Sequence, residues 1–130
     1  MKDIVFLQME DVLLFHREEM KVSGAKARIR DKKALDSAIH APQASYQGKL
    51  LMNIFEMAAT YANSICFNHP FLDGNKRVAA LSALAFLYLN GYELEEKYNE
   101  ELADFILLVV NKKLSKSDLA EYFKTHSRKL

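Results

Sequence analysis

Nine consecutive residues carry the side chains of this chain that are best suited to chemistry: His69-Pro70-Phe71-Leu72-Asp73-Gly74-Asn75-Lys76-Arg77. Histidine is the side-chain type that exchanges protons near neutral pH, so His69 could accept a proton from a hydroxyl nucleophile. Asp73 could hold Mg²⁺, which usually takes one or two carboxylates together with phosphate oxygens. The stretch therefore contains a candidate base and a candidate metal ligand.

The end of the same stretch suggests an anion site. Pro70 is predicted to end one helix and Gly74 to allow a sharp turn before the next, so Lys76 and Arg77 fall in the first turn of a new helix. Cations there are unfavourable by ~0.3–1 kcal/mol each, unless an anion occupies the free amides. Phosphate is the obvious anion. A base, a metal carboxylate, free amides and two cations are what phosphoryl or nucleotidyl transfer needs. The chain has neither a P-loop nor a kinase glycine-rich loop.

Each of these residues also has a structural interpretation. His69 could bond a carbonyl at a helix end, Asp73 could cap a helix, and Asp-Gly is a common turn dipeptide. Lys76 and Arg77 could simply be solvated, and Phe71 is expected to fill the core. Taken singly, the structural interpretations prevail. The combination of these residue types within nine positions favours a catalytic site.

The elements that must position this loop are predicted to be helices. Gly (4) and Pro (2) are scarce, which argues against a β-sandwich or barrel. Apolar periodicity and capping signals predict a single all-α domain over residues 1–130, a bundle of about six helices. The predicted helices are Met9–Lys21, Asp31–His40, Leu50–Asn68, Asn75–Asn90, Asn99–Lys113 and Lys116–His126. Residues 23–30 are expected to be an exposed loop or short hairpin and residues 44–49 a loop, with a minor strand near 4–7 or 92–94.

Composition excludes several classes of protein. The net charge is +1, from 18 basic and 17 acidic residues, so direct binding to nucleic acid is not expected. The longest apolar run, residues 78–89, is too short to span a membrane. A cytoplasmic protein without membrane contact is therefore the expectation. The single cysteine, Cys66, excludes an internal disulfide and is expected to be buried.

The charges are unevenly distributed along the chain. Residues 21–33 carry six basic side chains against Asp31, and residues 92–104 carry six acidic ones against Lys97. Either segment could be a solvated face. The basic segment precedes the candidate site, where it could also steer an acidic protein or contact phosphates.

Residues 69–77 resemble the signature HPFx[DE]GN[GK]R of the Fic/Doc superfamily. Ile29-Arg30-Asp31, Ala41-Pro42-Gln43 and Asn90-Gly91-Tyr92 are similar to the death-on-curing (Doc) branch. The resemblance implies an all-α fold. It also implies that His69 is the general base, that Asp73 binds Mg²⁺, and that the phosphates are held by Gly74, Asn75, Lys76 and Arg77.

Two positions within the helix favour the Doc branch. Fic proteins that transfer AMP have Gly at the position of Lys76 and a second Arg at the position of Ala80. The resemblance thus implies a protein kinase toxin that uses ATP and Mg²⁺ to phosphorylate a threonine of elongation factor Tu and so blocks translation. Transfer of AMP to a protein hydroxyl is the alternative within the superfamily, and an inert helical interaction module is the alternative from another class.

The resemblance also implies a Phd-like antitoxin as partner. Fic proteins that inhibit themselves carry an [ST]xxxE[GN] motif. Ser117 to Glu121 nearly fits it, but Tyr122 stands where Gly or Asn is required. Inhibition is therefore expected from another chain, through an amphipathic helix lying in a hydrophobic groove.

Overall fold

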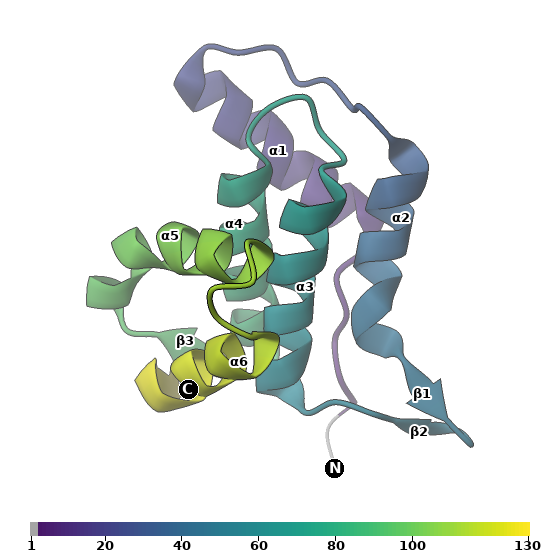
Figure 1. The fold of residues 1–130 in the computed structure, drawn as a ribbon, viewed down its shortest axis with the longest axis vertical. Coiled ribbons are helices and arrows are strands. Elements are labelled where there is room, and N and C mark those ends of the chain that lie inside the picture. The colour runs from purple at the N-terminus through teal and green to yellow at the C-terminus, as the bar shows by residue number, and fades with distance from the viewer. Residues whose placement is uncertain (1–2) are drawn as a thin grey trace.

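The computed structural model describes residues 3–130, which form six α-helices and two small antiparallel strand pairs (Figure 1). The predicted all-α class and helix number are confirmed. None of the helices within residues 3–130 is both long and apolar enough to cross a membrane. The helices are α1 (Met9–Ser23), α2 (Lys32–His40), α3 (Ile54–Asn68), α4 (Asn75–Leu89), α5 (Asn99–Val110) and α6 (Lys116–His126), with short 3-10 helices at Ala41–Gln43 and Glu96–Tyr98.

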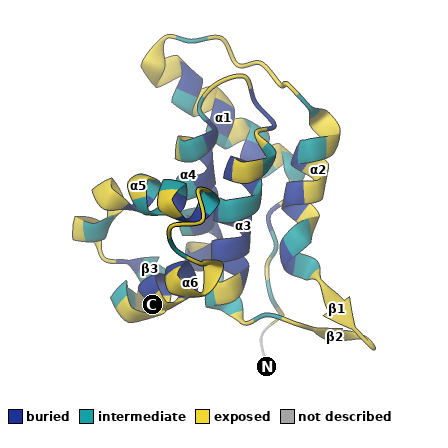
Figure 2. Cartoon of the chain, in the orientation of Figure 1, coloured by how far each residue is buried: buried dark blue, intermediate teal, exposed yellow. Residues whose placement is uncertain are grey.

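Helices α3 and α4 form the centre of the molecule (Figures 1 and 2). Both are dark blue over much of their length in Figure 2, because their buried residues make up a large part of the single hydrophobic core. Alanines at positions 58, 59 and 62 of α3 and at 79 and 83 of α4 are fully buried. Small side chains at this spacing let the two helix backbones approach closely. The loop that joins these helices is thus attached to two helices whose inner faces are fully buried.

One face of α4 is not covered. The nearly all-round apolar pattern of this helix predicts a central position, yet Leu81, Tyr88 and Leu89 are 37%, 61% and 48% exposed. The helix is central, as its pattern predicts, but this face stays exposed because no element within residues 3–130 packs over it.

Local signals set most helix ends. The Asp31 carboxylate accepts from the Ala34 amide, and Ser115 forms a reciprocal capping box with Asp118, both as the sequence predicts. The start of α3 was predicted too early. Asn53 caps that helix in a box with Glu56, so Leu51 lies outside it and is exposed rather than part of its buried stripe.

The strands differ most from the sequence expectation. Residues 44–49 are not a plain loop, because β1 (Ser45–Tyr46) pairs with β2 (Lys49–Leu50) through a turn in which Gln47 and Gly48 both have positive φ. A two-residue turn of this kind matches the twist of a hairpin. The predicted minor strand forms at β3 (Tyr92–Leu94), not at residues 4–7. Its partner β4 (Ser127–Lys129) was not predicted.

Candidate active site at the α3–α4 loop

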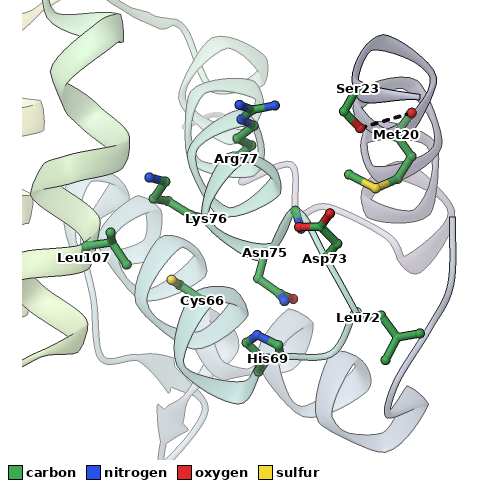
Figure 3. A pocket seen from close by; sticks show the side chains of 11 residues that line it. Met20, Ser23, Cys66, His69, Leu72, Asp73, Asn75, Lys76, Arg77 and Leu107 are labelled. Carbon is green, nitrogen blue, oxygen red and sulfur yellow. Dashed lines mark hydrogen bonds between the residues drawn. The ribbon is translucent and has the colours of Figure 1, made fainter. Parts of the chain in front are cut away.

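All six predicted site residues line one cavity of about 510 Å³ (Figure 3). His69 comes from the end of α3, Asp73 and Gly74 from the loop, and Asn75, Lys76 and Arg77 from the first turn of α4. Side chains of α1, α3, the loop and α5 complete the wall: Met20, Ser23, Cys66, Leu72 and Leu107. The volume lies in the usual range for small-molecule sites, about 300–1,000 Å³.

His69 ends α3 in an unusual backbone conformation. Its φ of 51° and ψ of 54° are left-handed, a region that residues other than glycine seldom adopt. Arg30 meets this helix end with two donors: Nε to the His69 carbonyl at 2.6 Å and Nη2 to the Asn68 carbonyl at 3.0 Å. The predicted helix-end position of His69 is confirmed. Its own carbonyl is held by Arg30, while its side chain is exposed and lines the cavity.

Phe71 anchors the loop to the hydrophobic core and is completely buried, as expected. Its ring stacks on His16 of α1, with the ring centres 3.7 Å apart. The Asn75 side chain accepts from the Phe71 amide at 3.0 Å and donates to the Phe71 carbonyl at 2.9 Å. Because the Asn75 side chain is buried in these two bonds, the group that Asn75 can offer to a bound anion is its backbone amide.

Helix α1 supports the second half of the loop. His16 is 2% exposed, and its Nε2 lies 2.9 Å from the Asp73 carbonyl, to which it donates. Gly74 has φ 84°, and a Cβ added there would lie 2.5 Å from the Met20 methyl group. The backbone conformation therefore favours glycine at position 74, and any larger residue would also displace the end of the Met20 side chain.

The Asp73 carboxylate is exposed at the cavity, and its Oδ1 accepts from the Gly74 amide at 2.8 Å. Within residues 3–130 there is no group of three or more His, Cys, Asp or Glu side chains that could hold a metal ion by itself. A single accessible carboxylate suits Mg²⁺, which keeps several waters and takes its other ligands from phosphates. The donor set therefore fits a magnesium ion that binds together with a nucleotide.

Lys76 and Arg77 diverge from the start of α4 toward opposite neighbours. Lys76 Nζ lies 3.9 Å from Asp104 of α5, and Arg77 Nη1 lies 3.6 Å from Glu19 of α1. These carboxylates offset part of the unfavourable position of two cations at a helix N-terminus. Long, partly exposed pairs of this kind contribute at most about 1 kcal/mol, so both cations stay available to a phosphate. The backbone amides in the first turn of α4 have no intrahelical acceptor, so they are further donors that a phosphate could use.

Cys66 is buried in the wall of the cavity, as expected. Burial raises the pKa of its thiol, and the positive charge of Lys76 opposes that shift. The thiol therefore stays protonated at neutral pH and acts as a small apolar side chain.

Four residues that shape the site were missed by the sequence analysis as parts of it: His16, Glu19, Met20 and Arg30. His16 and Met20 lie on the predicted buried stripe of the first helix, so periodicity indicated their burial but not their contact with the loop. Arg30 was recognised as one cation of a basic segment and as part of the Doc-like stretch Ile29-Arg30-Asp31, but without a role at the site. Its contacts lie 38 and 39 residues away in the sequence, where no local pattern could show them.

Comparison with known proteins supports the family resemblance that residues 69–77 indicate. The Fic/DOC family profile matches residues 6–87. "Toxin Doc" of Mycolicibacterium smegmatis is 32% identical over 103 residues, 78% of this chain and 77% of the relative. "Protein kinase doc" of Escherichia phage P1 is 30% identical over 112 residues, 86% of this chain and 87% of the relative. With well over half of its length matched by the family and both relatives covered over most of their own length, the chain belongs to the Fic/DOC family.

Proposed function

We propose that this chain is the toxin of a toxin–antitoxin pair and transfers the γ-phosphate of ATP to a protein hydroxyl in the cytoplasm, with a threonine of elongation factor Tu as acceptor. The observation that carries the proposal is the single cavity that collects a histidine, an exposed carboxylate, a helix N-terminus and two cations. The names of the two relatives, one a toxin and one a protein kinase, support the same activity.

In the proposed reaction, His69 accepts the proton of the acceptor hydroxyl while the oxygen of that hydroxyl attacks the γ-phosphorus. The new O–P bond replaces the bond between the γ-phosphorus and the β–γ bridging oxygen, and ADP leaves. The amides of the first turn of α4, together with Lys76 and Arg77, bind the phosphates and stabilise the charge that shifts toward ADP. Asp73 is the residue that would hold Mg²⁺, which when bound neutralises negative charge on the phosphate oxygens.

The same set of residues could serve AMP transfer if ATP bound in another orientation. That reaction requires the α-phosphorus beside His69, with pyrophosphate as the leaving group. Lys76 adds bulk and charge in the first turn of α4, and Ala80 presents only a methyl group one turn further along. These two positions are where the AMP-transferring relatives have Gly and a second Arg, and both differences favour γ-phosphoryl transfer.

Labelled ATP separates the alternatives. The protein is incubated with elongation factor Tu and ATP labelled at the γ or the α position, with His69→Ala as the matched control. The proposal expects γ-label and the mass of one phosphate on the acceptor, with ADP released, and no α-label. An α-label with pyrophosphate release would establish AMP transfer instead. Neither label, combined with no effect on growth, would favour the inert interaction module.

Inhibition by a second chain is the proposed form of control. Ser117 and Glu121 of α6 line openings shared with Asn53 and Glu56 at the start of α3, whereas His69 lies at the other end of that helix. A helix of 15 residues is about 22 Å long, so these two residues lie far from the cavity, which argues against an internal inhibitor. This placement supports an antitoxin acting in trans.

A groove on the uncovered face of α4 is the proposed antitoxin site. It has a volume of about 460 Å³ and joins α1, α4 and β3, with an apolar floor and acidic residues at its edge. An amphipathic helix with basic residues flanking its apolar face would match both features. The lining comprises Phe15, Leu81, Leu84, Ala85, Tyr88, Glu93, Leu94, Glu96 and Asn99.

A further inference from the structure

The contact between Arg30 and the end of α3 assigns this residue a role that neither its charge nor its place in a basic loop indicates. We infer that Arg30 is a positioning residue that holds His69 in the conformation needed for proton transfer. The inference rests on the proposed role of His69 as base. Arg30 itself is not among the residues that line the cavity.

The geometry of the contact is that of a fork. One guanidinium group bonds two successive carbonyls, those of Asn68 and His69, at 3.0 and 2.6 Å. These carbonyls belong to the last turn of α3, where helices leave acceptors unpaired and where a cation is favourable. A planar guanidinium can satisfy two such acceptors at once, whereas the point charge of lysine cannot hold both in a fixed geometry.

The backbone conformation of His69 depends on such a contact. Its left-handed backbone is strained for a residue that carries a Cβ. Residues persist there only when their surroundings enforce it. Without the fork, the exposed His69 is free to relax to another backbone conformation, and its ring would then point elsewhere in the cavity.

The rest of the loop does not need the Arg30 side chain. The amides of Arg30 and Asp31 both donate to the Pro70 carbonyl, at 2.7 and 3.0 Å, and Leu72 donates to the Arg28 carbonyl at 3.1 Å. Ile29 forms a β-bridge with Phe71, which is fully buried. The segment stays attached to the loop through its backbone, so removal of the side chain alone is expected to leave the fold intact.

The test compares Arg30→Gln with Arg28→Gln in the full chain. Both substitutions remove one positive charge from the same exposed segment, but of the two arginines only Arg30 donates side-chain hydrogen bonds to the end of α3. The first readout needs neither ATP nor acceptor: the three-bond amide–Hα coupling and the ¹³Cα shift of His69 measured by NMR, which report a left-handed backbone. They are expected to change in Arg30→Gln and to stay at their wild-type values in Arg28→Gln.

The second readout is the rate of phosphate transfer. Arg30→Gln is expected to lower kcat about 10–100-fold, since a displacement near 1 Å can cost about 10²-fold. The KM for ATP should change less than about twofold, because the phosphate-binding turn is not touched. Any loss in Arg28→Gln measures the general effect of the charge, so the excess loss in Arg30→Gln belongs to the fork. Arg30→Lys should restore little of it.

The outcomes are distinct. Unchanged His69 signals in Arg30→Gln, or an equal loss of kcat in both glutamine variants, would overturn the inference. If Arg30→Gln does not fold, the His69 signals of Arg30→Lys decide in its place, and wild-type values there would likewise overturn it. If the signals change but the wild-type protein transfers no phosphate, the positioning contact stands and the proposed kinase function fails.

Discussion

At the scale of single residues, the site depends on side chains that do little for the fold. His69 and Asp73 are both exposed, so replacing them leaves the core untouched. Expression of the wild-type chain alone is expected to arrest bacterial growth. His69→Ala should restore growth, because loss of a general base typically costs ~10²–10⁴ in rate. Asp73→Asn should restore growth too, because it removes the carboxylate proposed to hold Mg²⁺. Growth curves, with circular dichroism as the control for folding, check this prediction. A folded His69→Ala protein that remained fully toxic would contradict the assigned role.

Gly74 tests the close approach of α1 to the loop. Gly74→Ala is expected to lower the free energy of unfolding by about 1–3 kcal/mol, since the new methyl group meets Met20 in a left-handed backbone. Gly24 is the matched control: its φ of 78° is similar, but nothing lies within 4 Å of an added Cβ. Gly24→Ala should therefore lower the free energy of unfolding only through backbone strain, by about 1 kcal/mol. Equal losses in urea denaturation would mean that Met20 moves aside without cost.

At the scale of elements, the N-terminal segment is fastened to α3 by one buried phenol. Tyr61 is completely buried, and its hydroxyl oxygen accepts from the Leu7 amide at 3.0 Å. Tyr61→Phe leaves that amide unpaired and is expected to cost about 1–3 kcal/mol of unfolding free energy. Tyr46→Phe, in the exposed hairpin, is the control and should cost almost nothing. Urea denaturation at pH 7 of both variants measures the difference.

The same phenol gives the stability a pH dependence. Burial raises the pKa of Tyr61 to about 12 from its usual 10, although the bond from Leu7 acts in the opposite direction. The folded state thus retains a proton that the unfolded state loses first. The stabilisation from protonated Tyr61 is complete below pH 10 and disappears as the pH rises to 12. Between these values, the wild type should lose stability more steeply than Tyr61→Phe. Parallel slopes in pH-dependent denaturation would show that Tyr61 does not contribute.

At the scale of the whole molecule, the candidate active-site cavity and the proposed antitoxin groove involve the same two helices, α1 and α4. Met20 of α1 lines the cavity and Glu19 pairs with Arg77 of its wall, whereas Phe15 lines the groove. The first turn of α4 is the proposed phosphate site, and Leu81 and Tyr88 further along the helix line the groove. A partner in the groove would therefore pack against both helices that shape the active site.

The groove can be tested without touching the chemistry. Leu81→Asp places a charge on its apolar floor and is expected to leave toxicity intact while reducing rescue of growth by the co-expressed antitoxin. Leu50→Asp, a leucine of similar exposure in β2, is the control and should remain rescued. Co-purification of the antitoxin with each variant provides the second measurement. Full rescue of Leu81→Asp would place the antitoxin elsewhere.

The sequence by itself determined what depends on neighbouring residues. Helix positions follow from a 3.6-residue period and from caps such as Asp31 and Ser115, which act within one turn. The candidate site was recognisable for the same reason, because its six residues lie in one stretch of nine. Local signals also set the start of α3 and the β1–β2 hairpin, although they were overlooked. The Asn53 cap sets the start of α3, and the turn residues Gln47-Gly48 set the hairpin.

Only the tertiary structure decided which distant residues surround that stretch. Arg30 reaches His69 across 39 positions of sequence and His16 reaches Asp73 across 57. Strand β4 pairs with β3 with 35 positions between Glu93 and Arg128. Such contacts depend on how whole helices pack, and no period or spacing encodes them. The open face of α4 is a further case: its apolar pattern indicates burial, and the fold leaves it exposed because nothing in the described chain covers it.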